Sequence, residues 1–433
     1  MAQLIHVVGL GVETGGQLTR PAEEAVHEAE VIIGAQRQLD WLLGFEGYQS
    51  CRAKLQLLPK LSQLQALIGR YAGQIVILAS GDPLHFGIGR WLGERYPVSQ
   101  LRYYSAVSSI QAACARLGLA QQECQVVSLH GRPLSSLKRY LQPGRRLIVL
   151  TDQHSHPGAL ARLCVEAGLG ESRLWVCARL GYPDEQVQGF QVGEMDDFAP
   201  SSVDALQVSV LELRGSGGVY PSFPGLDDRL LLTDGGPGQG MITKREVRIQ
   251  ILSLLQANEN QVLWDVGAGC GGVSTEIALW HPGLQIHAIE PVPERLACLR
   301  ANKEQFGCSN LWPVDGRAPA ALADWPDPDR IFIGGSDGAL NTLLAQCWSR
   351  LRAGGVLVAS AVTEPSYAIL AAFAERHTAF NSQLLTLTVS RREYQQGQGQ
   401  EEGQGKGQGE GQWQVIDKRP VTLLRLEKAE GGP

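Results

Sequence analysis

The chain has 433 residues, which is too many for one hydrophobic core and about right for two domains. Hydrophobic residues make up 44% of the chain and charged residues 19%, as is ordinary for a globular α/β protein. The formal net charge of −6 argues against a nucleic-acid-binding surface, which is usually basic.

Short apolar runs alternate with helical patterns through the first half, and this alternation predicts layered α/β structure. Thr19 is expected to cap a helix that has Pro21 and Glu23 in its first turn and Ala22 on its apolar face. The expected strands of this half are Leu4–Leu10, Ile75–Ala79, Val126–Leu129, Leu147–Leu150, Leu174–Ala178 and Val208–Leu213.

A glycine-rich stretch, Arg214–Pro221, has no apolar periodicity and ends in proline. We therefore expect a linker at 214–222 between two domains, 1–213 and 223–433. The expected strands of the second domain are Val262–Val266, Leu284–Ile289, Leu311–Val314, Ile331–Ile333, Val356–Ala359, Leu384–Val389 and Val421–Leu426. Five strand–helix units followed by a terminal β-hairpin are the order of elements in class I Rossmann-like methyltransferases.

Residues 395–412 consist almost wholly of Gly, Gln and Glu, with one Lys. Such a composition cannot bury apolar surface, so we expect a disordered insert. The segment falls between the last two expected strands, and insertions at a hairpin tip cost little. We interpret it as a tolerated expansion rather than a partner-binding tail.

The most informative stretch is Asp265–Gly271, which reads D-V-G-A-G-C-G, with Glu290 placed 25 positions after Asp265. Glycines allow a sharp turn and close approach to a ligand, and a carboxylate after the second strand can accept both hydroxyls of a ribose. An acid beside the pyrophosphate of NAD would repel it, whereas the ammonium and sulfonium of S-adenosylmethionine (SAM) are positive. The pattern favours SAM over a dinucleotide or an ordinary strand–helix turn.

Two later strand ends belong to the same expected site. Asp315 is either an adenine contact or an ordinary loop acid. Gly334 and Gly335 leave room for a bulky, flat substrate. The Asn/Asp-Pro-Pro-aromatic segment with which nucleic-acid amino-methyltransferases hold an amine is absent from the sequence here.

The second half, about 225–430, resembles the decarboxylating precorrin methyltransferase domain. The segment Gly240–Arg248 is similar to the TK-x-E-x-R helix of that family, and Trp264–Gly269, Ala288–Glu290, Gly316–Pro319, Asp327–Asp329 and Phe332–Ser336 follow in the family's order. With the glycine motif, the resemblance implies a SAM site formed by Thr243, Asp265, Gly267, Ala268, Gly269, Cys270, Gly271, Glu290 and Ala318. Arginine suits a polycarboxylate substrate, so Arg245, Arg248 and Arg317 are expected to bind its carboxylates, with an ordinary solvated surface charge as the alternative for each. The expected substrate residues also include Gly334 and Gly335.

The first half resembles the tetrapyrrole methylase family, which has two α/β subdomains with SAM in the cleft between them. The residues that carry the resemblance are Val7–Gly11, Leu78–Pro83, Ser105–Ser109, His130–Pro133 and Leu180–Glu185. They imply SAM contacts from Gly11, Gly81, Asp82, Ser108 and Ser109, and a substrate contact from Arg132. Val12 and Glu13 stand where the family often has proline and glycine.

The pairing of both halves on one chain resembles the bifunctional methyltransferases of cobalamin biosynthesis. It implies a precorrin tetrapyrrole substrate, SAM-dependent methylation of carbons 5 and 15, and decarboxylation of the ring C acetate. Aligning and desolvating reactive partners suffices for such chemistry, so we expect no metal. The alternatives are a SAM enzyme that acts on RNA or protein, and a non-catalytic SAM-binding scaffold.

The cellular context is expected to be the cytoplasm. Nine cysteines form no C-x-x-C pair, which favours reduced thiols, and the N-terminus has no signal-peptide pattern. No apolar run approaches the roughly 20 residues of a membrane span. We expect no nucleic-acid or membrane partner, and the resemblance implies a homo-oligomer.

Overall fold

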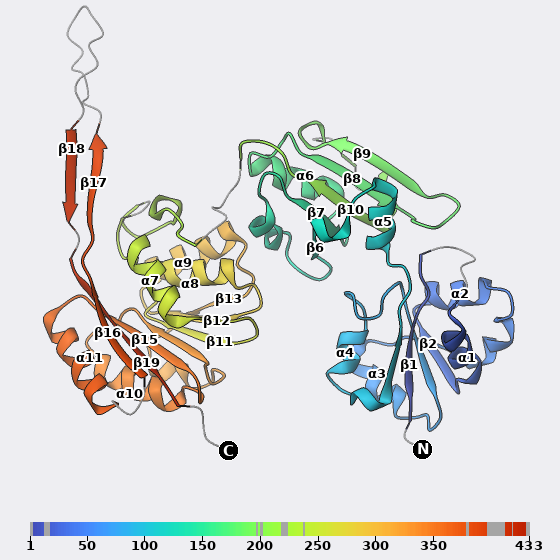
Figure 1. Cartoon of the computed structure of the whole chain (residues 1–433), viewed down its shortest axis with the longest axis horizontal. Coiled ribbons are helices and arrows are strands. Elements are labelled where there is room, and N and C mark those ends of the chain that lie inside the picture. Colours follow the sequence, from blue (N-terminus) through green and yellow to red (C-terminus); the bar gives the residue numbers. More distant parts are fainter. Residues whose placement is uncertain are drawn as a thin grey trace, which may run out of the picture. The chain divides into compact units, whose positions relative to one another are not determined.

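The computed structural model describes residues 3–12, 18–195, 198–199, 202–217, 224–236, 239–377, 381–395, 412–417 and 419–429. The chain forms two compact units, Met1–Val219 and Tyr220–Pro433 (Figure 1). The division falls in the expected linker, of which residues 218–222 lie outside the described part of the chain. Helices pack on parallel-rich sheets in both units, which confirms the expected α/β class.

The first unit begins with a five-stranded parallel sheet in the order β3-β2-β4-β1-β5. Every residue of β1 and β4 is buried, because helices cover both faces of the sheet. α1 and α2 pack on one face, and α3 and α4 on the other. The elements are β1 (Ile5–Gly9), α1 (Arg20–Glu28), β2 (Val31–Gly34), α2 (Gln36–Gly44), β3 (Leu55–Leu57), α3 (Leu61–Ile68), β4 (Ile75–Ala79), α4 (Gly89–Gly93) and β5 (Leu101–Tyr104).

A second sheet of the same unit has the order β6-β7-β10-β8-β9. β6 and β7 are parallel, and the other pairs are antiparallel. α5 and α6 belong to different apolar clusters of this sheet. The elements are α5 (Ser109–Leu117), β6 (Cys124–Ser128), β7 (Arg146–Leu150), α6 (Pro157–Glu166), β8 (Arg173–Ala178), β9 (Gln186–Gln191) and β10 (Gln207–Glu212).

The second unit is built on a seven-stranded sheet in the order β13-β12-β11-β14-β15-β19-β16. The first five strands are parallel, and β19 runs antiparallel to both β15 and β16, so the expected terminal hairpin is confirmed. The strands are β11 (Val262–Val266), β12 (Gln285–Glu290), β13 (Leu311–Asp315), β14 (Arg330–Ile333), β15 (Val356–Ala361), β16 (Asn381–Leu387) and β19 (Val421–Glu427).

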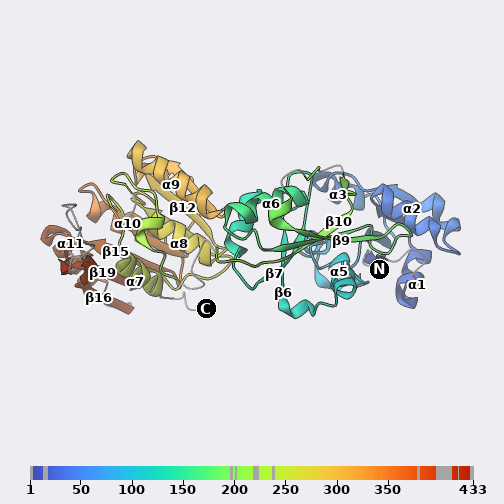
Figure 2. The same ribbon diagram turned by 90° about the horizontal axis from the view of Figure 1, so that it is seen from above.

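Helices cover both faces of this sheet as well. α10 and α11 enclose the main apolar cluster, with Trp264 fully buried in it. Figures 1 and 2 show α8 and α9 side by side next to β12. The helices are α7 (Arg245–Leu255), α8 (Gly272–Trp280), α9 (Pro293–Phe306), α10 (Leu340–Arg350) and α11 (Glu364–Arg376).

A two-stranded ribbon continues the hairpin beyond the sheet (Figure 1). It consists of β17 (Ser390–Gln395) and β18 (Gln412–Asp417), whose last pair is Gln395 with Gln412. The ribbon therefore flanks residues 396–411, the body of the expected insert, which lie outside the described residues.

Short 3-10 helices complete the description at Gln49–Lys54, Val98–Gln100, Gln121–Glu123, Leu134–Tyr140, Val192–Glu194, Asp228–Leu230 and Ala320–Leu322. Thr19 precedes α1 as expected, but its side chain forms no capping hydrogen bond. Across the described ranges, no helix combines the length and apolar character that crossing a membrane requires.

Candidate functional site

A pocket of about 480 Å³ opens in the second unit where the carboxyl ends of β11, β12 and β14 meet. This is the point at which the strand order reverses, and open α/β sheets bind ligands there. The volume is within the range of small-molecule sites. Of the expected SAM residues, the lining includes Thr243, Gly267, Ala268, Gly269, Glu290 and Ala318.

The floor of this pocket is formed by two glycine turns in contact with each other. A Cβ atom on Gly267, whose φ is +70°, would lie 2.4 Å from the carbonyl oxygen of Gly335. A Cβ atom on Gly269, whose φ is +59°, would lie 2.9 Å from the carbonyl oxygen of Met241. No side chain fits at either position, so a ligand meets main-chain atoms there.

Glu290 joins the end of β12 to the glycine turn. Its carboxylate is 3% exposed and accepts the N–H of Gly269 at 2.8 Å and the N–H of Val292 at 3.0 Å. A carboxylate has about four lone-pair sites, so two remain for ligand hydroxyl groups. The site therefore fits an adenosyl group on the evidence of both the glycine floor and this acid.

Asp265 does not line the pocket, and the expected SAM contact is corrected. The residue is fully buried on β11, and its Oδ2 accepts the hydroxyl of Ser274 on α8 at 2.5 Å. Burial raises the pKa of this carboxyl to about 7. Its short, inward-pointing side chain fastens α8 behind the glycine turn rather than reaching a ligand.

Cys270 and Gly271 are also outside the lining, contrary to expectation. The Cys270 side chain is fully buried, with its sulfur 3.7 Å from a carboxylate oxygen of Asp234. Gly271 precedes α8 with φ +83°, and a Cβ there would lie 2.2 Å from the Leu299 side chain. Both residues shape the start of the helix.

Arg248 is not a substrate residue, because its side chain is entirely buried. Its Nε donates to Glu276 at 2.5 Å, and its Nη1 donates to Asp228 at 2.9 Å and to the carbonyl of Thr243 at 2.7 Å. Its Nη2 donates to the carbonyl of Leu226 at 2.5 Å. The guanidinium thus fixes the segment before α7 against α8.

The expected role of Arg245 is likewise not supported, because its half-exposed side chain lies outside the lining, 3.8 Å from Glu246. Arg317 does line the pocket with Gly334 and Gly335, and it is paired with Asp337 at 2.7 Å. Asp315, at the end of β13, is exposed and lies outside the residues that line the pocket.

Arg419, just before β19, is a pocket residue that the sequence patterns did not indicate. It is exposed and, among the residues that the structure describes, has no hydrogen-bond or ion-pair partner. Nearby, Arg391 of β17 donates to both carboxylate oxygens of Glu246, at 2.8 and 2.7 Å. The base of the ribbon is thereby attached to the rim of the pocket that Arg419 also lines.

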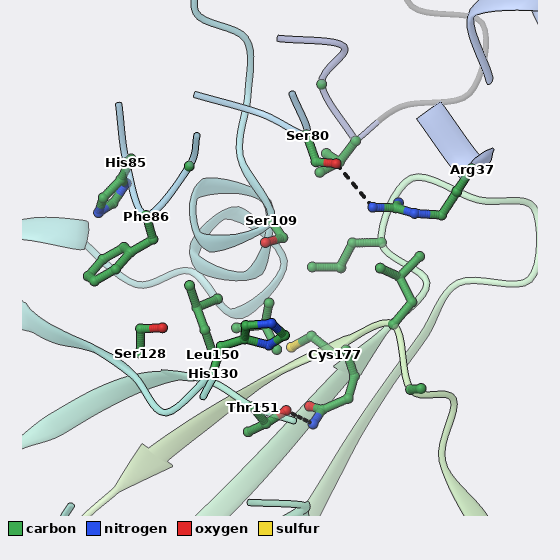
Figure 3. A pocket seen from close by; sticks show the side chains of 18 of the residues that line it. Arg37, Ser80, His85, Phe86, Ser109, Ser128, His130, Leu150, Thr151 and Cys177 are labelled. Carbon is green, nitrogen blue, oxygen red and sulfur yellow. Dashed lines mark hydrogen bonds between the residues drawn. The ribbon is translucent and has the colours of Figure 1, made fainter. Parts of the chain in front are cut away.

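A larger pocket of about 840 Å³ lies between the two sheets of the first unit (Figure 3). Arg37 of α2 donates to the Ser80 hydroxyl at 3.0 Å and to the Tyr182 hydroxyl at 3.5 Å, linking the two walls. On the far wall, Gln207 donates to Thr151 at 2.5 Å. The lining also includes His130 and Tyr182, which belong to the segments that carry the family resemblance. Other lining groups were not indicated by the sequence: Arg37, Trp41, His85, Phe86, Arg90 and Gln207.

Of the residues expected here, Gly11, Ser109 and Arg132 line the pocket. Gly81 and Ser108 do not: they pack against each other, and a Cβ on Gly81 would lie 2.7 Å from Cα of Ser108.

Asp82 is also outside the lining and accepts the N–H of Leu84 at 2.8 Å. Gly81, Asp82 and Ser108 lie outside the lining for one reason, because each of them builds the turns behind the pocket wall. Glu13, the second departure from the family's glycine loop, lies outside the described residues.

Two family models match the chain: Tetrapyrrole (Corrin/Porphyrin) Methylases over residues 4–196, and Precorrin methyltransferase domain over residues 237–400. A protein of Sinorhizobium sp, named precorrin-6Y C(5,15)-methyltransferase [decarboxylating], is 36% identical over 389 residues, 89% of this chain and 91% of that protein. The chain belongs to the precorrin-6Y C(5,15)-methyltransferase (decarboxylating) family. Methyltransferases of this family use SAM as the methyl donor.

Two Salmonella typhimurium proteins are similar to parts of this precorrin-6Y C(5,15)-methyltransferase family member. A cobalt-precorrin-6B C(15)-methyltransferase (decarboxylating) is 41% identical over 117 residues, 27% of this chain and 60% of that protein. A cobalt-precorrin-7 C(5)-methyltransferase is 29% identical over 194 residues, 45% of this chain and 93% of that protein. The two activities in the family name thus also occur on separate chains.

Proposed function

We propose that the chain methylates carbons 5 and 15 of a precorrin tetrapyrrole of cobalamin biosynthesis and removes the ring C acetate carboxylate as carbon dioxide. The observation that carries the proposal is that each unit has its own large pocket at the carboxyl ends of parallel strands. One family model lies over each pocket-bearing half, and relatives named for each single activity support the division.

The second unit is proposed to methylate carbon 15 and to decarboxylate. SAM, when bound, supplies an electrophilic methyl group. The chain's part is to hold the donor, with Glu290 accepting ribose hydroxyls and the main chain of Gly267 and Gly269 allowing close approach. Alignment of two reactive partners in a site that excludes water removes much of the barrier to transfer.

The substrate carries several carboxylates, so a cation at the rim with no partner among the described residues is significant. Arg419 is placed to bind one of them, and a planar guanidinium does so through two parallel hydrogen bonds. Gly334 and Gly335 leave the wall beside it free of side chains. Decarboxylation breaks one carbon–carbon bond, and the electron pair stays in the conjugated macrocycle until a proton is taken up, leaving a methyl group.

The first unit is proposed to methylate carbon 5. Its pocket is larger, about 840 Å³ against about 480 Å³, and three arginines line it: Arg37, Arg90 and Arg132. Arginines around a roomy pocket suit a ligand with several carboxylates. Self-association of the chain remains a prediction of the resemblance, and a cytoplasmic location remains a prediction of the cysteine pattern.

The variant Gly335→Leu tests the assignment of the second unit. A Cβ on Gly335 meets only ordinary contacts, 3.6 Å from the Gly267 carbonyl oxygen, so a side chain can begin there without a collision, and we expect leucine to occupy space in the pocket. We expect loss of both carbon dioxide release and carbon 15 methylation, with SAM binding and carbon 5 methylation retained. The assay is incubation with precorrin and labelled SAM, followed by NMR assignment of the methylated carbons.

Gly267→Ala is the matched control, since its Cβ would collide with the Gly335 carbonyl oxygen and SAM binding should fall as well. The separately expressed fragments 1–213 and 223–433 complete the test, because calorimetry should find one SAM site in each. Carbon dioxide release at the normal rate from Gly335→Leu, or from fragment 1–213, would contradict the assignment.

A further inference from the structure

Phe86 stands at the tip of the loop that follows β4 and lines the pocket of the first unit (Figure 3). Its φ is +57°, in the left-handed region, and its side chain is 51% exposed. A bulky residue rarely adopts this conformation, which glycine adopts freely. The next residue is a glycine, Gly87, yet the left-handed conformation falls on Phe86, where a side chain makes it energetically costly.

The loop gives Phe86 no freedom to relax. The N–H groups of Leu84 and His85 donate to Asp82, at 2.8 and 3.2 Å, and the N–H of Gly89 donates to the Pro83 carbonyl at 2.9 Å. A Cβ on Gly87 would lie 2.5 Å from that carbonyl oxygen, so the chain is packed tightly there. The surrounding contacts therefore impose the conformation that presents the ring to the pocket.

Packing does not account for the ring. Phe86 belongs to neither apolar cluster of the first sheet, and its ring contact within the described residues is with His85, at 5.0 Å. Leu84 beside it is 56% exposed. The half-exposed ring gives the fold only partial burial and holds the backbone in a strained conformation, and strain of this kind concentrates at ligand-binding sites.

We propose that Phe86 is the surface on which the conjugated macrocycle of the precorrin stacks in the first unit. A flat, half-exposed ring with Leu84 beside it forms an apolar lip, which suits a ligand too large to be enclosed. Phe86 and His85 lie on one side of the view in Figure 3, and Arg37 and Ser80 on the other. The macrocycle would rest on the ring while arginines of the same pocket bind its carboxylates.

This inference rests on the proposed methylation of carbon 5, and the test separates the two. In the full-length protein, Phe86→Gly removes the ring and also relieves the left-handed backbone. We expect an apparent KM for precorrin in carbon 5 methylation that rises about tenfold, or about 1.4 kcal/mol. The KM for SAM should be unchanged, and the apparent Tm unchanged or higher by about 2–4 °C. Phe86→Tyr should restore the wild-type KM.

Gln256→Gly is the control, because Gln256 also has a positive φ, +46°, but lines neither pocket. It should leave both KM values unchanged. An unchanged precorrin KM or a lowered Tm in Phe86→Gly would overturn the inference and give the ring a structural role. An equal rise in the KM for SAM would overturn it in favour of an adenine contact. Failure of the wild-type protein to methylate carbon 5 would instead refute the proposed function.

Discussion

Replacing Arg248 with methionine should destabilise the second unit without acting on the substrate. The guanidinium donates to two buried carboxylates, Glu276 and Asp228, and to the carbonyls of Leu226 and Thr243. Methionine has a similar length but no donor, so all four acceptors lose this partner. Removal of one member of a buried ion pair costs about 3–5 kcal/mol, mostly because the charge left behind is desolvated.

The lower end of that range is expected here. Glu276 keeps the N–H groups of Gly225 and Leu226, and Asp228 keeps Arg391 at 3.8 Å. A loss of about 3 kcal/mol lowers the apparent Tm of a domain of this size by about 6–12 °C. Because Arg248 also holds the Thr243 carbonyl at the pocket edge, the affinity of the variant for SAM should fall together with its Tm.

Differential scanning calorimetry of Arg248→Met, with Arg245→Met as control, checks this expectation. Arg245 is half-exposed on the same helix, so its replacement should change stability by no more than about 0.5 kcal/mol. The double variant with Glu276→Gln should be less than additive, since the two residues share one interaction. An unchanged Tm together with a raised KM for precorrin would refute the reasoning and restore Arg248 as a substrate residue.

Glu290→Ala should weaken SAM binding to fragment 223–433 about 100-fold or more, since two charge-assisted hydrogen bonds are worth about 1.5–3 kcal/mol each; unchanged affinity in calorimetry would remove Glu290 from the site. Asp265→Asn tests the raised pKa of about 7. The stability that the protonated Asp265 contributes is complete below its unfolded pKa of 3.8 and is lost as pH rises through about 7. The difference in Tm between wild type and Asp265→Asn should therefore change between these two pH values. A difference in Tm that stays constant over this range would contradict the raised pKa. Deleting 396–411 and closing the ribbon with a short turn should leave Tm and turnover nearly unchanged, because this composition cannot support packing; a large drop in either would show that the segment docks.

The sheets could be predicted where a strand is buried on both faces. Ile75–Ala79 and Val262–Val266 were expected with the bounds that β4 and β11 have, because continuous apolar runs mark such strands. β9 was missed because it is an edge strand with mostly exposed side chains, which becomes a strand through pairing with β8 rather than through its local sequence. β2 is a fully buried apolar run, but it has only four residues and directly follows the pattern of α1, so the sequence alone did not separate it from that helix.

The pocket of the second unit could be predicted where a local motif forms it, as with the glycine turn of Gly267 and Gly269 and the acid Glu290 that binds this turn. The sequence did not show which way the side chains of α7 point. Glu246 and Arg248 are two positions apart, about 200° around a helix, so one lines the pocket while the other is buried. Arg419 is far from the motifs in sequence and reaches the rim only through the fold of the hairpin.

The contact between Gly267 and Gly335 divides the pocket surface into a main-chain part that substitutions cannot alter gradually and a side-chain part that they can. Main-chain atoms are the same whatever residue is encoded, and a Cβ on Gly267 would collide with the facing turn. The floor that receives the methyl donor is therefore closed to gradual adjustment. Met241, Arg317 and Arg419 on the rim have exposed side chains. Changes of acceptor, in evolution or by engineering, should accumulate at these rim positions while donor binding stays constant.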